Sequence, residues 1–104
     1  AARAAARLAG AELPAFPDTE TTFPELHARI ATALAYLGGF TENQFADASM
    51  RVIELKLRSG DRTLSGLEYL TIYSTPQFYF HATTAYNILR HNGVPLGKLD
   101  YMGT

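Results

Sequence analysis

The sequence contains no cysteine, no tryptophan and no excess of either charge. The absence of cysteine excludes disulfides, thiolate zinc sites and thiol nucleophiles from these 104 residues. Nine Lys and Arg residues stand against ten Asp and Glu residues, which gives a formal net charge of -1. Proteins that grip nucleic acid through its phosphates carry a basic patch or stripe, so we expect no nucleic-acid partner.

Long apolar runs are missing as well. One stretch, Tyr69 to Leu89, has no charged residue, but polar side chains from Thr71 to Asn87 interrupt it. A membrane-spanning helix needs about 20 predominantly apolar residues. We therefore predict a buried helix of a cytoplasmic protein in this stretch, and no membrane partner.

The composition is 47% hydrophobic and 18% charged, which is typical of a globular protein. A chain of this length can form one domain, which we place at residues 1–104. The Ala-rich residues 1–9 predict a helix that ends at Gly10. Nine residues are marginal for an isolated helix, so we expect it to continue a longer helix upstream.

Two prolines between residues 10 and 21 predict a crossover loop, which Leu13 and Phe16 hold to the core. Thr22 and Glu25 then have the spacing of a capping box, which predicts a helix start. Apolar residues follow at helical spacing as far as the Gly38-Gly39 pair: Phe23, Leu26, Ile30, Leu34 and Leu37. A second capping box at Thr41 and Gln44, with Phe40 and Phe45 at the spacing of a hydrophobic staple, predicts a short helix.

The period of the pattern changes after residue 50. Ile53, Leu55 and Leu57 alternate with charged residues, which predicts a half-buried strand over 51–58. The residues 59–61 predict a turn, and 62–65 a second strand. A lone hairpin is marginally stable, so it must lie on the helices.

A third capping box, Ser65 with Glu68, predicts the start of the last helix. Pro76 interrupts this helix, so either the helix kinks there or Thr75 caps a new helix that has Pro76 at its first position. Gly93 fits the left-handed position after the helix end, in a Schellman turn that brings the next residue to Leu89. The residues 94–104 are then a tail that Leu96, Tyr101 and Met102 dock.

These elements predict an all-α fold, an up-down four-helix bundle with a small β-hairpin before the last helix. Three major helices are present in whole or in part, whereas a stable bundle of this kind has four. We therefore expect the N-terminal helix or helices to be missing from these residues, which would be the C-terminal two-thirds of one domain.

Histidine is the remaining residue type that favours a metal site. His81 lies on the core-facing stripe of the last helix, with these neighbours: Phe78, Ala82, Ala85 and Leu89. Two interpretations stay open for His81, a hydrogen-bonded structural histidine or a metal ligand. His91 lies in the last helical turn, which the helix dipole favours, and His27 flanks the apolar stripe of its helix.

No pattern predicts a catalytic centre, and we assign no catalytic residue. No histidine has a glutamate three residues before it, and there is no H-E-x-x-H sequence. The residues 93–98, GVPLGK, are one residue short of a P-loop and follow a helix instead of a strand. Whether the protein is an enzyme therefore stays open.

Aromatic residues crowd the last helix between Tyr69 and Tyr86. Core packing is one explanation. The other is an apolar ligand pocket inside the bundle, for which we predict Phe78, Thr84 and Tyr86 as lining residues. The hydroxyls of Thr83 and Thr84 can either contact such a ligand or bond back to their own helix.

The residues 78–103, FYFHATTAYNILRHNGVPLGKLDYMG, resemble the C-terminal region of an uncharacterised bacterial family in the DinB/YfiT-like superfamily. The segments AAARLAG at 4–10 and TTFPEL at 21–26 also fit its pattern. The resemblance implies a four-helix bundle of about 150–170 residues. Superfamily relatives often resemble homodimers, so it also implies a homodimer.

Many superfamily members resemble metal-dependent thiol-S-transferases or hydrolases that have a three-histidine site. The resemblance implies one ligand from the second helix and two from the fourth, four residues apart. Only His81 carries over, because Ala85 stands four residues later and cannot bind a metal. A fold does not carry its chemistry without the site residues.

Two functional hypotheses follow. The preferred one is a DinB-like bundle with a degraded metal site and no cofactor, which binds a small-molecule ligand or associates as a homodimer. The alternative is a metal-dependent thiol transferase or hydrolase, in which His81 and ligands outside these residues hold a divalent metal, Zn or Ni.

Overall fold

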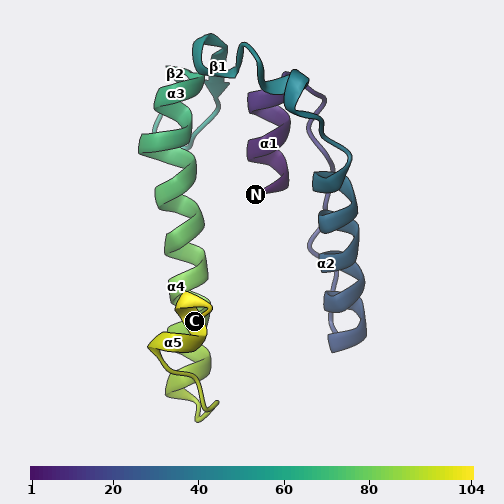
Figure 1. Cartoon of the computed structure of the whole chain (residues 1–104), viewed down its shortest axis with the longest axis vertical. Coiled ribbons are helices and arrows are strands. Elements are labelled where there is room, and N and C mark those ends of the chain that lie inside the picture. The colour runs from purple at the N-terminus through teal and green to yellow at the C-terminus, as the bar shows by residue number, and fades with distance from the viewer.

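A computed structural model describes all residues of the chain, 1–104. It is mostly helical and has one two-stranded sheet, as the sequence predicts. The long helices are α1 (Ala2–Ala9), α2 (Phe23–Gly38) and α4 (Thr75–His91). Figure 1 shows α1 between α2 and α4, with the segment from α2 to α3 crossing one end of the molecule. No helix is both long and apolar enough to cross a bilayer.

The capping box at the start of α2 is formed as predicted. The backbone N–H of Thr22 donates to the Glu25 carboxylate at 2.9 Å, and the N–H of Thr21 donates to the same oxygen at 2.8 Å. The Thr22 hydroxyl accepts from the N–H of Glu25. These backbone hydrogen bonds, the one from Thr21 first, hold the pKa of the Glu25 carboxyl below its ordinary value of 4.5.

The chain crosses from α2 to the hairpin through two short 3-10 helices, η1 (Glu42–Phe45) and η2 (Ala48–Met50). The Gln44 side chain accepts from the N–H of Thr41 at 2.8 Å, and the rings of Phe40 and Phe45 lie 5.7 Å apart. The predicted staple and start signal are therefore confirmed, although the turn is 3-10 and not α-helical.

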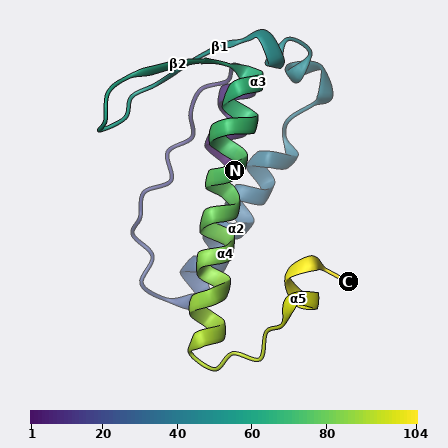
Figure 2. The ribbon, with the colours of Figure 1, turned by 90° about the vertical axis from the view of Figure 1, so that its left-hand side faces the viewer.

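The hairpin consists of β1 (Val52–Leu55) and β2 (Arg62–Ser65), paired antiparallel with Ile53 opposite Leu64. Figure 2 shows it projecting from the end of the helices at which α3 begins. The alternating pattern buries Ile53 and Leu55, which form the main core cluster with Leu64 and Tyr69. Ala4 and Leu8 of α1 pack against this cluster, so the hairpin lies on the helices as predicted.

The last long helix is continuous from Gly66 to His91 through three segments. A turn of α-helix, α3 (Gly66–Glu68), follows the predicted Ser65 capping box and leads into a π-helical segment, η3 (Tyr69–Ser74), and then α4. A prolyl ring has no N–H to donate and crowds the carbonyl one turn earlier. The wide π turn directly before Pro76 accommodates both effects.

One of the alternatives drawn from the sequence for Pro76 needs correction. Thr75 has helical dihedrals, φ -65° and ψ -49°, so it does not cap a new helix. The ribbon runs through this region without a break in both views of Figures 1 and 2. A widened helical turn takes the place of the predicted break, and a kink at Pro76 remains a prediction.

The predicted end of α4 is confirmed. The N–H of Val94 donates to the Leu89 carbonyl at 3.1 Å, and the N–H of Gly93 donates to the Arg90 carbonyl at 3.1 Å. Together these bonds form a Schellman turn. The tail is not irregular throughout, because it contains a short helix, α5 (Lys98–Met102), in which the Asp100 carboxylate accepts from the N–H of Gly97.

Gly93→Ala should lower the free energy of unfolding by about 1 kcal/mol, because a side chain disfavours the left-handed backbone. Gly93 has a φ of 91°, and an added Cβ would meet no atom within 4 Å, so the whole cost is conformational. Urea denaturation followed by circular dichroism measures it. An unchanged midpoint would contradict this assignment of the helix end.

Candidate functional site

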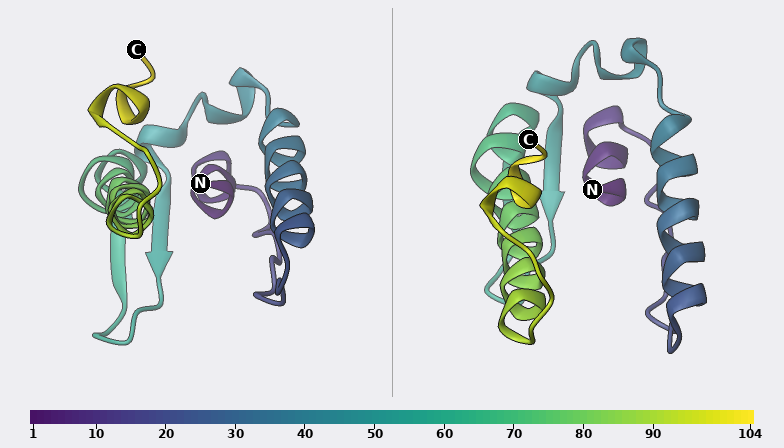
Figure 3. Two further views of the ribbon diagram at one scale, coloured as in Figure 1. Left: turned by 90° about the horizontal axis from the view of Figure 1, so that it is seen from below. Right: turned by 60° about the horizontal axis from the view of Figure 1, so that its bottom comes forward.

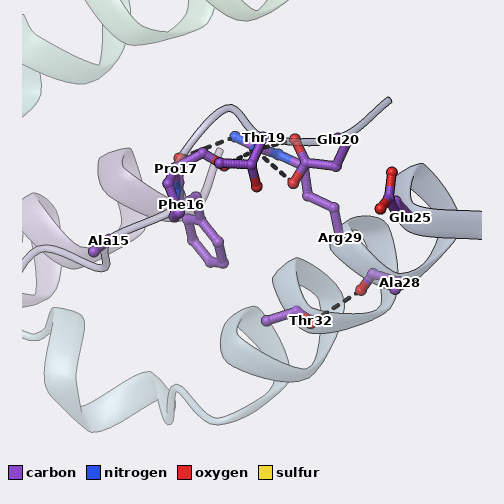
Figure 4. Close-up of a pocket in the computed structure, with 9 residues that line it drawn as sticks. All are labelled: Ala15, Phe16, Pro17, Thr19, Glu20, Glu25, Ala28, Arg29 and Thr32. Carbon is purple, nitrogen blue, oxygen red and sulfur yellow. Dashed lines mark hydrogen bonds and ion pairs between the residues drawn. The ribbon is translucent and has the colours of Figure 1, made fainter. Parts of the chain in front are cut away.

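A cavity of about 390 Å³ lies between the crossover loop and α2. Figure 4 shows its walls, which come from both segments. The lining residues are Ala15, Phe16, Pro17, Thr19, Glu20, Glu25, Ala28, Arg29 and Thr32. Its only cation is Arg29, so the chemistry of this cavity depends on what that guanidinium binds.

The Arg29 guanidinium is fully engaged by the loop. It donates to both oxygens of Glu20 at 2.9 and 3.0 Å and to the Pro17 carbonyl at 2.8 Å, and it pairs with Asp18 at 3.0 Å. A backbone hydrogen bond at Glu20, followed by the bond from Arg29, holds the pKa of the Glu20 carboxyl below its ordinary value of 4.5. The hydrogen bond to Glu20 in turn raises the pKa of Arg29.

The ring of Phe16 completes this contact. It lies 6.0 Å from the Arg29 guanidinium and packs edge-on against Tyr36 at 6.2 Å. Phe16 therefore holds the loop, as the sequence predicts. Arg29 is bound by the loop and Glu25 by the helix cap, so these charged groups of the larger cavity are used within the fold. The cavity lies where the loop is attached to α2.

A smaller cavity, about 200 Å³, lies between α4 and α5. Figures 1 and 2 show the chain reversing after α4 so that α5 returns along that helix. Tyr86, one of the predicted pocket residues, lines this cavity. Its hydroxyl is buried and has no hydrogen-bond partner, which distinguishes it from every other buried side-chain polar atom of the chain.

The other two predicted pocket residues, Phe78 and Thr84, line neither of these cavities. Both side chains are exposed on α4. At 3.6 residues per turn, Thr84 projects about 160° away from Tyr86 around the helix, so one compact pocket does not collect both. The assignment of Phe78 and Thr84 to a ligand pocket remains a prediction.

His81 is exposed on α4, with its ring edge-on to Phe80 at a centroid distance of 5.3 Å. Nowhere in the chain do three His, Cys, Asp or Glu side chains come together as a metal site requires. His81 supplies one nitrogen ligand, and Ala85 stands where the resemblance implies a second. The residues of this chain by themselves therefore do not fit a metal centre.

Two features of these cavities, the contacts of Arg29 and the helix α5, were not predicted from the sequence. Arg29 bonds to residues 9 to 13 positions away in an irregular loop, and no sequence period predicts such contacts. The helix α5, which builds the smaller cavity, did leave a local signal, because Gly97 and Asp100 have the spacing of a helix start.

Comparison with known families agrees with this fold. The family model described as the domain of unknown function DUF1993 matches residues 1–102. The chain belongs to the DUF1993 family. A solved crystal structure, of a DinB family member protein from Shewanella denitrificans, is 45% identical to this chain and superposes with a TM-score of 0.84.

The match with the DinB family member covers 97% of the DUF1993 chain and 57% of the other chain. The DUF1993 chain thus spans little more than half the length of its solved relative. No curated protein matches it. The resemblance seen in the sequence is confirmed at the level of a DinB-like domain of unknown function.

Proposed function

We propose that this DUF1993 chain forms the larger part of a DinB-like four-helix bundle, and that the bundle acts by binding rather than by metal-dependent catalysis. The observation that carries the proposal is the uncovered apolar stripe of α2. Leu26, Ile30 and Leu34 are 43%, 56% and 64% exposed, although their spacing puts them on one helix face.

The small number of buried residues supports the packing of further sequence on the exposed apolar faces of these helices. Only seven of the 104 residues are buried, and six of them are hydrophobic, which is a small core for a chain with 47% hydrophobic residues. Fully burying a Leu or Ile side chain stabilises a protein by about 1.5–3 kcal/mol. The stripe on α2 and the exposed Phe78 and Leu89 on α4 are therefore surfaces that packing would stabilise.

The occupant that we propose for these faces is helical sequence of the same bundle, outside residues 1–104. The solved DinB family member supports this choice, because 57% of its chain is matched at a TM-score of 0.84 and the rest lies outside the match. Figure 3, seen along the helices, shows α4, α1 and α2 in one curved row rather than in a closed bundle. Association of two such bundles as a homodimer extends the same proposal.

The metal-dependent alternative has weaker support. A catalytic zinc site has about three protein ligands and one open position. His81 offers one ligand, and it belongs to no group of three His, Cys, Asp or Glu side chains that could hold a metal ion. A thiol transferase or hydrolase would need every other ligand from outside the chain.

Metal analysis separates the two functions. We expect the purified full-length protein, prepared without chelator, to contain no Zn or Ni above background, and His81→Ala to leave that content unchanged. His91→Ala is the matched control, because His91 is exposed in the last turn of the same helix. Stoichiometric metal that is lost in His81→Ala and kept in His91→Ala would contradict the proposal.

A further inference from the structure

The cavity between α4 and α5 has the composition of a polar ligand site. Four of its residues lie on α4 at the spacing i, i+3, i+4 and i+7, which places them on one face. The remaining two come from α5. The six residues are Thr83, Tyr86, Asn87, Arg90, Lys98 and Tyr101.

The walls of this cavity are tied together. The hydroxyls of Thr83 and Tyr101 hydrogen-bond at 3.0 Å, and the ring of Tyr101 packs edge-on against Tyr86 at 5.3 Å. The Schellman turn at Gly93 fixes the reversal of the chain between the two helices. The cavity is therefore a built feature of the tail and not a chance gap beside it.

Three polar groups of the cavity have no partner within the chain. The Tyr86 hydroxyl is buried without a hydrogen bond, which is unfavourable unless a bound group satisfies it. Arg90 and Lys98 form no ion pair, whereas Arg29 and Lys56 elsewhere in the chain do. An arginine, a lysine and a phenolic hydroxyl thus line one cavity without an acceptor or a counter-ion from the chain.

No carboxylate of the chain forms an ion pair with Arg90 or Lys98. Asp100 is the only acidic residue after Glu68, and one of its oxygens accepts from the N–H of Gly97 at 2.7 Å. Two cations and a donor hydroxyl that have no partner within the chain are suited to an anionic group with several oxygen acceptors, because charge-assisted hydrogen bonds are the stronger ones.

We propose that the α4–α5 cavity binds a small molecule that carries an oxyanion, a carboxylate or a phosphate group. Arg90 and Lys98 contact the anionic oxygens, and the Tyr86 hydroxyl donates a hydrogen bond to the ligand. A volume of about 200 Å³ suits a small metabolite, since pockets for drug-sized ligands begin near about 300 Å³.

This site is distinct from the apolar faces of the proposed bundle. On α4 its centre lies about 120° around the helix from the stripe that contains Phe78 and Leu89. Binding of an oxyanion there therefore requires neither a metal at His81 nor a particular occupant of the apolar faces.

Calorimetric titration tests the proposal on the purified protein at constant ionic strength. One arm uses inorganic phosphate, a second uses succinate, and succinamide serves as the uncharged analogue of succinate. We expect saturable binding of phosphate or succinate and none of succinamide. The anion that binds identifies which of the two groups the natural ligand carries. Absence of saturable binding of both anions would overturn the proposal.

Variants locate the binding. Arg90→Gln combined with Lys98→Gln should lower the affinity for the anion by about tenfold or more, because hydrogen bonds between charged groups contribute the most to binding. Lys56→Gln combined with Arg58→Gln, which removes the same two charges from exposed positions of the hairpin, should leave the affinity unchanged. An equal loss of affinity in both variants would show that net charge alone causes the effect, and it would overturn the proposed site.

Tyr86→Phe keeps the ring and removes only the hydroxyl. It therefore tests the site even if the charge variants fail to fold. We expect weaker anion binding, by about threefold to tenfold, together with an unchanged or raised melting temperature, because an unpaired buried hydroxyl is removed. Unchanged affinity with a lowered melting temperature would show that the hydroxyl serves the fold and would remove Tyr86 from the site.

Discussion

Gly66→Ala should nearly abolish the stability of the fold. An alanine Cβ at this position would overlap the backbone carbonyl oxygen of Ala48 and lie 2.8 Å from its carbonyl carbon. Neither atom belongs to a flexible side chain, so η2 and the start of the last helix would have to move apart. Overpacking of a core typically costs about 1–3 kcal/mol, and we expect a backbone clash to exceed that range.

A second glycine provides the matched control. Gly38 is the last residue of α2, and a Cβ added there would meet no atom within 4 Å. Gly38→Ala should therefore be neutral or should stabilise the protein by up to about 1 kcal/mol, through the lower entropy of the unfolded chain. Urea denaturation curves of the two variants make the comparison. Equal midpoints would show that the approach of Gly66 to Ala48 is not tight.

Leu55→Ala should lower the free energy of unfolding by about 2–5 kcal/mol. Leu55 is 2% exposed and belongs to the main core cluster, together with Ile53, Leu64 and Tyr69. Truncation removes apolar contacts and leaves a cavity under the hairpin. The core cluster at this place joins the strands to the helices. The expected loss is a large fraction of the 5–15 kcal/mol that stabilises a typical domain.

The control for Leu55 lies on the same strand. Val52 is 69% exposed, on the opposite face of β1. Val52→Ala should cost less than about 1 kcal/mol, because it changes only strand propensity and surface contacts. Thermal unfolding followed by circular dichroism is the measurement for both variants. Similar losses at the two positions would contradict the assignment of the buried face.

The helix starts and the hairpin were predictable because their causes are local. Thr22 with Glu25 and Ser65 with Glu68 each satisfy backbone N–H groups three residues apart, and such bonds form wherever the spacing occurs. The alternation at Ile53 and Leu55 identifies the buried face of β1 in the same way. The turn at Gly93 is a third local feature, set by its left-handed backbone.

Other parts of the fold depend on contacts that no short window contains. The response to Pro76 was open in the sequence, because a kink, a new cap and a wide π turn all accommodate a residue without an N–H. The clamp at Arg29 depends on the path of a loop, which places Asp18 and Glu20 beside α2. Tertiary structure decides both.

Some residues of the candidate site can be recognised in the sequence, whereas others depend on the tertiary structure. Tyr86 was predicted, from its place among the aromatics of the last helix, to line an apolar pocket inside the bundle, and that pocket remains a prediction. The cavity that Tyr86 lines is a different, polar one against α5. Lys98 and Tyr101 were beyond prediction as site residues, because the tail must first fold back on α4 to bring them there. His81 is recognisable in the sequence, but whether other ligands meet it depends on three-dimensional neighbours, and the chain brings no group of three candidate ligands together.

The central claim is that the apolar face of α2 is a packing surface, and a paired substitution in the full-length protein tests it most directly. Ile30→Asp puts a charge on the stripe, whereas Ala31→Asp puts the same charge at an exposed position about 100° around the helix. If further helices cover the stripe, the melting temperature should fall steeply for Ile30→Asp and little for Ala31→Asp. Equal, small shifts would show that the face is exposed to water in the complete protein and would contradict the account.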